Sequence, residues 1–293
     1  MNIQSISIVP ETVGCDAHCK YCIARMTPPV EKKLRVKLTH LDEALVYAKS
    51  GGAQSAIITS KGETLLSDWS FIGEILDLCD EMGFGQRDLH TNAKHIEGRE
   101  KEFKKYFIEN EGHLTNITIT MASMDPVVNG DIMGINYDIP RVLEFLSKEC
   151  DLTVRLSCVM NESAVRDRRT MEEYIRKAGE YGVKAIVFRE LWIPVEINDN
   201  PRSKDVNEWS RKNRVPIEIG DAALKAMKKE DLAHPIFTLP WGQVVYDVEG
   251  LNVACSQCTE NFPESRPGFI KSVVYLPDNH LYSSWEFRGS IIF

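Results

Sequence analysis

The sequence predicts an α/β protein, a partial (β/α)6 TIM-like barrel followed by a C-terminal β-rich cap. Short apolar, β-branched segments alternate with amphipathic segments of helical period along residues 3–194, a pattern typical of parallel strands joined by helical crossovers. Beyond this point the alternation stops and short strand-like segments dominate. We therefore expect a barrel domain over residues 1–194 and an extension over residues 195–293.

Six strands are expected where apolar and β-branched residues concentrate. The helices between them should begin at capping residues, such as Thr39 and Thr170, and end at glycines, such as Gly51 and Gly182. The expected strands cover residues 3–9, 55–59, 87–91, 116–121, 152–159 and 183–191, and the expected helices cover residues 39–50, 67–82, 98–110, 137–149 and 170–182.

The extension has a different character. Residues 192–235 are polar and irregular except for a small helix expected over residues 221–231. From residue 236 onward, β-like segments follow one another, with turns expected at 248–250 and 277–279. We expect these strands to cover the open side of the barrel.

Composition limits the class of protein. The 293 residues are 43% hydrophobic and 27% charged, as in a soluble globular protein. No segment is long and apolar enough for a membrane span, and no signal peptide is present, so we expect a cytoplasmic protein without membrane partners. A net charge of −8 argues against a broad nucleic-acid surface.

The eight cysteines include a triplet and a pair, which suits metal binding in a reducing compartment. Cys15, Cys19 and Cys22 follow the first strand with C-x3-C-x2-C spacing. Three thiolates can hold three irons of a [4Fe-4S] cluster and leave the fourth iron open to an outside ligand. A structural zinc site with His18 as the fourth ligand and a plain electron-transfer cluster are the alternatives.

This spacing resembles the signature of the radical S-adenosylmethionine (SAM) enzymes, and Tyr21 matches the aromatic residue that precedes their third cysteine. The resemblance implies that SAM binds the open iron, that a reductant such as flavodoxin or ferredoxin supplies an electron, and that a 5'-deoxyadenosyl radical forms. It also implies SAM contacts from residues near the strand ends. These are Tyr21, Gly62, Glu63, Thr91, Asn92, Thr120, Arg155, Ser157 and Trp192.

Several of these residues have a different explanation. Thr91, Asn92 and Thr120 could be ordinary residues at strand ends. Glu63 could be an ordinary surface acid. Arg155 faces a barrel interior if the strand assignment is right, where it needs a partner. That partner could be the SAM carboxylate or a structural acid.

Residues 154–160 and 188–192 are similar to the molybdenum-cofactor GTP 3',8-cyclases within that family. Those enzymes have lysine in place of Arg155 and methionine in place of Trp192. They also carry a C-terminal cysteine triplet and a Gly-Gly tail, whereas this chain has only Cys255 and Cys258 and ends in Phe293.

The tail resembles a degenerate twitch or SPASM cap, with Ser284 where those modules have cysteine. Cys255 and Cys258 could therefore hold an auxiliary Fe–S cluster. A redox dithiol and a pair of structural thiols are the alternatives.

We therefore expect a radical SAM enzyme that abstracts hydrogen from a small polar, nucleotide-like molecule. Cys158, Arg189 and Glu190 are candidate catalytic residues, although Cys158 could be a core residue and Arg189 could pair with Glu190. The first strand begins almost at the start of the chain, so we expect no leader-peptide recognition domain ahead of it. A peptide-modifying radical SAM enzyme and a non-catalytic Fe–S or zinc protein are the competing interpretations.

Overall fold

The computed structural model describes residues 2–26, 33–193, 201–257, 268–285 and 288–293. The chain forms two compact units. The first unit contains Met1–Asp16, Pro29–Thr118 and Glu264–Phe293, and the second contains Ala17–Pro28 and Ile119–Pro263. The expected division at residue 194 stays a prediction.

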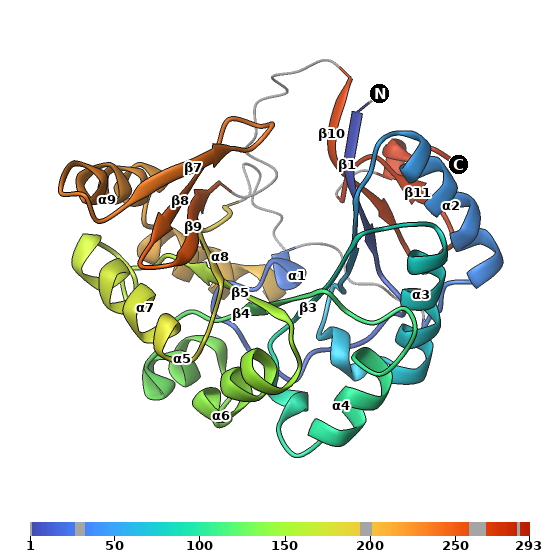
Figure 1. Ribbon diagram of the computed structural model, residues 1–293, viewed down its shortest axis with the longest axis horizontal. Helices are drawn as coiled ribbons and strands as arrows, with labels where there is room; N and C mark the ends of the chain where they lie inside the picture. Colours follow the sequence, from blue (N-terminus) through green and yellow to red (C-terminus); the bar gives the residue numbers. More distant parts are fainter. Residues whose placement is uncertain (1, 27–32, 194–200, 258–267, 286–287) are drawn as a thin grey trace. The chain divides into compact units, whose positions relative to one another are not determined.

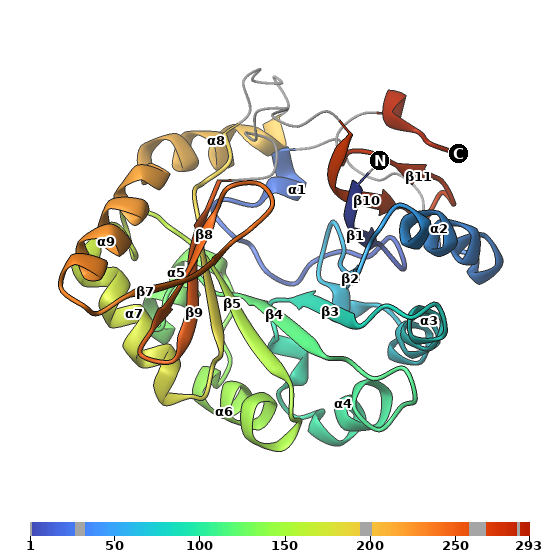
Figure 2. The same cartoon turned by 45° about the horizontal axis from the view of Figure 1, so that its top comes forward.

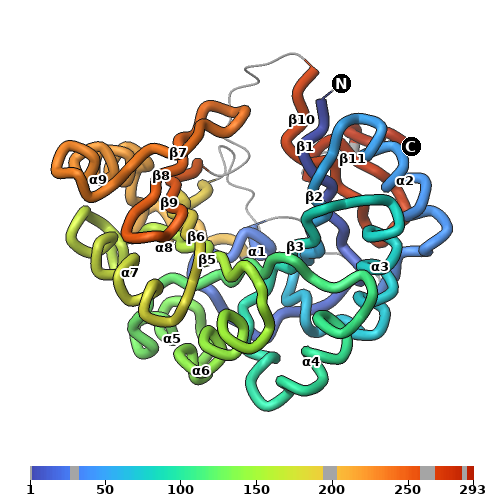
Figure 3. The backbone as a smooth tube through the Cα atoms, viewed as in Figure 1, coloured from blue at the N-terminus to red at the C-terminus, as the bar shows by residue number. Residues whose placement is uncertain are grey.

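The strands of the first unit form a largely parallel sheet. They are β1 (Asn2–Ile8), β2 (Ser55–Ile58), β3 (Gln86–Thr91), the first residues of β4 (Asn116–Thr120), β10 (Phe269–Tyr275) and β11 (Leu281–Tyr282). Their order is β11-β10-β1-β2-β3-β4. β10, β1, β2 and β3 are parallel, whereas β11 runs antiparallel to β10. Figure 3 shows β10, from the end of the chain, beside β1.

Helices cover one face of this sheet. Figure 1 shows α2 (Leu38–Ser50), α3 (Trp69–Glu81) and α4 (Glu100–Phe107) on the same side of the strands. That side is apolar because alternate strand residues, such as Ile6, Ile58 and Leu89, are fully buried. Short helical turns lie at η1 (Thr64–Leu66), η2 (Lys94–Ile96) and η5 (Arg288–Ser290).

The second unit contains the end of β4 and five further strands. These are β5 (Thr153–Val159), β6 (Ala185–Arg189), β7 (His234–Thr238), β8 (Val244–Val248) and β9 (Leu251–Ser256). Their order is β4-β5-β6-β9-β8-β7. β5, β6 and β9 are parallel, and β8 and β7 continue the sheet in antiparallel orientation, as Figure 2 shows.

Six α-helices lie in the described residues of the second unit, and α7 packs against α9, which lies along β9. They are α1 (Ile23–Met26), α5 (Pro126–Met133), α6 (Ile139–Glu144) with a π-helical continuation η3 (Phe145–Glu149), α7 (Arg168–Glu180), α8 (Pro201–Asn213) and α9 (Ile217–Lys229). No helix in the described part of the chain is both long and apolar enough to cross a bilayer.

The predicted fold class is confirmed: the six predicted strands are β1 to β6, and antiparallel strands follow in the C-terminal part. The C-terminal strands take a place that the sequence did not indicate. β9 pairs with β6 and β10 pairs with β1, so the predicted cap contributes strands to the sheets of both units.

Three α-helices of the described chain were not predicted: α1, which is a single turn in a segment expected to be a loop, α5 and α8. α8 covers a segment that was expected to be irregular. The prediction missed it because polar residues, Ser203, Asn207 and Ser210, occupy much of its buried side, so the sequence shows little apolar repeat of helical period. α5 begins at a cap formed by Asp125, whose carboxylate accepts hydrogen bonds from the amides of residues 127 and 128.

Candidate metal and cofactor site

In the first unit, the loop after β1 contacts the loop after β2. The Glu63 amide donates a hydrogen bond to the Gly14 carbonyl at 2.9 Å. A Cβ atom added to Gly62 would lie 2.1 Å from the Gly14 oxygen and 2.6 Å from the Val13 oxygen. Glycine is therefore the residue that allows this approach, directly before Cys15.

Glu63 connects the β2 loop to the end of β3. Its residue is 2% exposed, and its carboxylate accepts hydrogen bonds from the Asn92 amide at 2.7 Å, from the Leu65 amide at 3.0 Å and from the Thr91 hydroxyl. Burial raises the pKa of Glu63 to about 7, although these three hydrogen bonds act in the opposite direction. The structure thus brings together three residues that were predicted as cofactor contacts, and gives Glu63 a buried position rather than a surface one.

Asp16, inside the cysteine motif, contacts the loop after β3. Its Oδ1 accepts a hydrogen bond from Asn92 Nδ2 at 3.2 Å, and its Oδ2 lies 3.2 Å from His95 Nε2 and 3.3 Å from Lys94 Nζ. Burial opposes ionisation, but the Asn92 hydrogen bond and the nearby His95 and Lys94 outweigh it, so the pKa of Asp16 lies below its ordinary value. Sequence reasoning missed these contacts, since nothing in the motif spacing indicates them.

The three motif cysteines are accessible thiols. Cys15 belongs to the first unit and is exposed, whereas Cys19 and Cys22 belong to the second and are partly exposed. None of the three forms a disulfide. Over the described ranges, no three His, Cys, Asp or Glu side chains are gathered as a finished metal site. Each of these thiols is accessible to an outside group, and thiolates are the ligands of Fe–S clusters and, with His18 as a fourth ligand, of the alternative zinc site.

In the second unit, the end of α5 holds the middle of the motif. His18 and Lys20 donate backbone hydrogen bonds to the Met133 and Ile132 carbonyls, each at 2.9 Å. Gly134 has a φ of +69°, and a Cβ atom there would lie 2.9 Å from His18 Cβ. The segment before Cys19 is therefore paired with the last turn of this helix.

Tyr21 lies in an apolar cluster rather than on an open surface. Its residue is 8% exposed, and the ring lies 6.2 Å from that of Trp209. Its hydroxyl has no hydrogen-bond partner among the residues that the structure describes. Tyr21 thus anchors the motif by packing. The other buried members of this cluster are Ala122, Ile132, Met133, Ile135 and Leu191.

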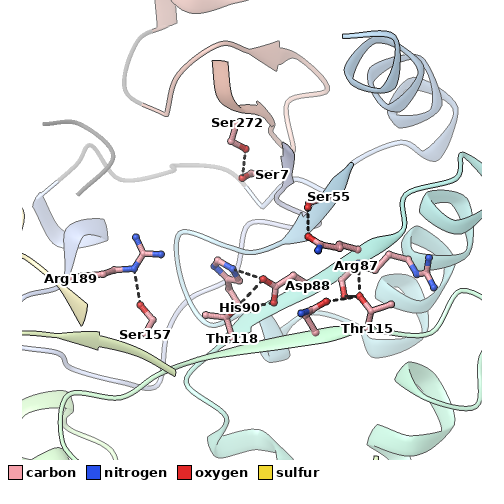
Figure 4. A network of polar contacts seen from close by, with 12 residues as sticks. Ser7, Ser55, Arg87, Asp88, His90, Thr115, Thr118, Ser157, Arg189 and Ser272 are labelled. Atoms are coloured by element: carbon pink, nitrogen blue, oxygen red, sulfur yellow. Dashed lines mark hydrogen bonds and ion pairs between the residues drawn. The ribbon is translucent and has the colours of Figure 1, made fainter. Parts of the chain in front are cut away.

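Arg189 and Glu190 each contact a residue of another segment. Arg189 Nε donates to Ser157 Oγ at 2.9 Å, as Figure 4 shows. Glu190 is buried and accepts from Arg214 Nε at 2.6 Å. The remaining predicted contacts of this unit, Thr120, Arg155 and Trp192, are half-buried.

The other candidate cysteines of the second unit lie in its core. Cys158 is fully buried, with its Sγ 3.8 Å from the Ala122 carbonyl oxygen. Cys255 is 4% exposed, and its Sγ would be 2.7 Å from a Cβ atom on Gly220 of α9. Burial raises the pKa of both thiols. Cys258 lies outside the described residues, so an auxiliary cluster stays a prediction.

The sheet face of the first unit opposite to its helices is polar, which sequence reasoning did not single out. Asp88 accepts from Thr118 Oγ1 at 3.0 Å and lies 3.3 Å from His90 Nε2. Ser7 and Ser272 are hydrogen-bonded at 2.9 Å (Figure 4). Polar groups on a buried strand face are unusual in parallel sheets, and they give this face the chemistry of a binding surface.

Known proteins resemble this chain in structure only. No family model and no curated protein matches its sequence. SuiB from Streptococcus suis bound to S-adenosylmethionine has a TM-score of 0.66 at 14% identity, covering 98% of this chain and 61% of SuiB. SuiB bound to precursor peptide SuiA has a TM-score of 0.64 at 12% identity, covering 97% and 60%. This chain thus spans about three fifths of the length of SuiB.

Two further structures agree. AnSMEcpe with bound AdoMet has a TM-score of 0.61 at 14% identity, covering 99% of this chain and 77% of that protein. A radical SAM methyltransferase from Sphaerobacter thermophilus has a TM-score of 0.52 at 13% identity, covering 87% and 66%. The chain therefore has the fold of the radical SAM enzymes.

Proposed function

We propose that this protein is a radical SAM enzyme in which Cys15, Cys19 and Cys22 hold a [4Fe-4S] cluster. The observation that carries the proposal is a C-x3-C-x2-C loop directly after β1 in a chain with this fold. When bound, the cluster and SAM would supply hydrogen-atom abstraction.

The chain's own residues would position these groups. Glu63 and Asn92 join the loops after β2 and β3, and Gly62 lets the β2 loop reach the backbone before Cys15. Tyr21 and the end of α5 fix the segment that contains Cys19 and Cys22. Because the donors sit on loops at strand ends, the rigid strands set their positions.

A peptide is the substrate class that the comparisons favour, since SuiB is described in complex with a precursor peptide. This reverses the order of preference drawn from the sequence, in which a small polar molecule came first. The small polar substrate remains the second candidate, because Asp88 and His90 give the first unit a polar sheet face.

The test is anaerobic reconstitution with iron and sulfide, followed by dithionite and SAM. We expect release of 5'-deoxyadenosine by the wild type and none by Cys15→Ala, whereas Cys79→Ala keeps the activity because Cys79 is a buried residue of α3 outside the motif. Activity that survives in Cys15→Ala contradicts the proposal.

The substrate class is tested by adding pools of synthetic peptides or of nucleotides to the same reaction. Stimulation by peptides and not by nucleotides is the expected result. The reverse result rejects the peptide reading and leaves the radical SAM assignment intact.

A further inference from the structure

The segment that carries Cys15 lacks an apolar anchor. From Glu11 to Asp16, all of which the structure describes, every side chain is half-buried or exposed. A Cβ atom added to Gly14 would meet nothing within 4 Å. Since no side chain of this segment is fully buried, its backbone contacts and hydrogen bonds set the position of the cysteine.

Polar anchors occur at every second residue of the segment. The Thr12 amide donates to the Leu34 carbonyl at 2.8 Å, and the Gly14 carbonyl accepts from the Glu63 amide at 2.9 Å. The Asp16 carboxylate accepts from Asn92 Nδ2 at 3.2 Å. Cys15 is therefore held between two anchored neighbours.

Both neighbours of Cys15 are connected to Glu63 by hydrogen bonds. Gly14 is bound by the Glu63 backbone amide, and Asp16 is bound by the side chain of Asn92, whose own amide donates to the Glu63 carboxylate at 2.7 Å. The Asn92 side chain is also fixed at its other end, because its Oδ1 accepts from the Lys94 amide at 3.0 Å. Glu63 therefore binds the residue before Cys15 directly through its amide, and the residue after it through Asn92.

The ion pairs of Asp16 constrain it less than its hydrogen bond from Asn92. The Lys94 side chain is 39% exposed, and a pair with that much solvent contact contributes little to stability. Oδ2 of Asp16 and Nε2 of His95 lie 3.2 Å apart but form no hydrogen bond with each other. The Asn92 amide is 5% exposed as a residue and has its donors and acceptor oriented by the turn. The hydrogen bond from Asn92 is therefore the stronger constraint on Asp16.

We propose that Asp16 is a positioning residue, whose hydrogen bond from Asn92 fixes Cys15 for cluster binding. The inference rests on the proposed function only in taking Cys15 as a cluster ligand. The ordering of the loop by Asp16 is expected in the cluster-free protein as well.

The experiment compares Asp16→Ala with Lys94→Met, which removes one ion pair and keeps the Asn92 hydrogen bond. Hydrogen–deuterium exchange of the cluster-free full chain is followed by mass spectrometry on the peptide that spans residues 11–22. Asp16→Ala should exchange about tenfold faster in this peptide, the effect of one hydrogen bond to a charged group. Lys94→Met should exchange at the wild-type rate.

Iron content and the electron paramagnetic resonance spectrum of the reduced protein form the second readout. We expect Asp16→Ala to hold less iron than the wild type, and Asp16→Asn to recover part of it because its amide oxygen still accepts from Asn92. Far-UV circular dichroism checks that each variant folds.

An unchanged exchange rate in Asp16→Ala, or equal damage by Lys94→Met, overturns the inference. A wild type that takes up no iron while Asp16→Ala still exchanges faster contradicts the proposed function instead, and leaves the ordering role of Asp16 standing.

Discussion

Replacing Gly62 by alanine tests whether the loops after β1 and β2 are locked together. The new Cβ atom would lie 2.1 Å from the Gly14 oxygen and 2.6 Å from the Val13 oxygen, against ordinary contacts of 3.4–4 Å. Both obstacles are backbone atoms, so no side chain can turn away, and one loop must move by roughly 1 Å. That movement breaks the Glu63–Gly14 hydrogen bond of 2.9 Å.

The expected loss of stability combines two effects. Overpacking of this kind costs about 1–3 kcal/mol, and a broken backbone hydrogen bond adds about 1 kcal/mol. We therefore expect Gly62→Ala to lower the free energy of unfolding by about 2–4 kcal/mol. Urea denaturation of the cluster-free protein measures it, and a smaller iron content after reconstitution should accompany the loss.

Gly14→Ala is the matched control, because it lies in the same pair of loops and its Cβ atom would meet nothing within 4 Å. It should change the free energy of unfolding by less than about 0.5 kcal/mol. If Gly62→Ala and Gly14→Ala have the same stability, the two loops are not packed as described and the reasoning is refuted.

Three further predictions concern other parts of the site. Because burial raises the pKa of Glu63 from 4.5 to about 7, the folded state binds this proton more tightly than the unfolded state. As the pH rises from 4.5 to 7, the free energy of unfolding of the wild type should therefore fall by up to about 3 kcal/mol relative to that of Glu63→Gln. Urea denaturation at a series of pH values measures this, and a difference between the two proteins that does not change with pH contradicts the prediction. Gly134→Ala should cost about 1–2 kcal/mol more than Gly250→Ala, since both have positive φ but only the first would contact His18; equal unfolding midpoints would show that His18 simply moves. Tyr21→Phe removes a buried hydroxyl without a described partner and should be neutral or stabilising by about 1 kcal/mol in thermal unfolding, whereas a clear loss would reveal a partner.

The strands and the ends of their loops could be predicted from the sequence. Each of β1 to β6 is a short apolar or β-branched segment between helical ones, which local periodicity reveals. Gly62, Glu63, Thr91 and Asn92 could be placed together because neighbouring parallel strands end at the same edge of a sheet.

What the sequence did not reveal depends on contacts between distant residues. Nothing in the spacing of the motif shows that Asp16 meets Asn92, which lies 76 residues away. For Cys158 the sequence left a catalytic and a core role open, and its full burial, with Sγ 3.8 Å from the Ala122 carbonyl oxygen, places it in the core. The pairing of β10 with β1 is similarly invisible, because a strand pattern does not specify its partner.

In the proposed enzyme, three thiolates hold the cluster and leave one iron open for SAM. Electron–nuclear double resonance on the dithionite-reduced protein, with SAM labelled by 15N and 17O in its amino and carboxylate groups, tests it most directly. We expect magnetic coupling of both labels to a cluster of about four irons, lost in Cys15→Ala. A wild-type cluster without coupling to either label, or zinc in place of iron, would contradict it.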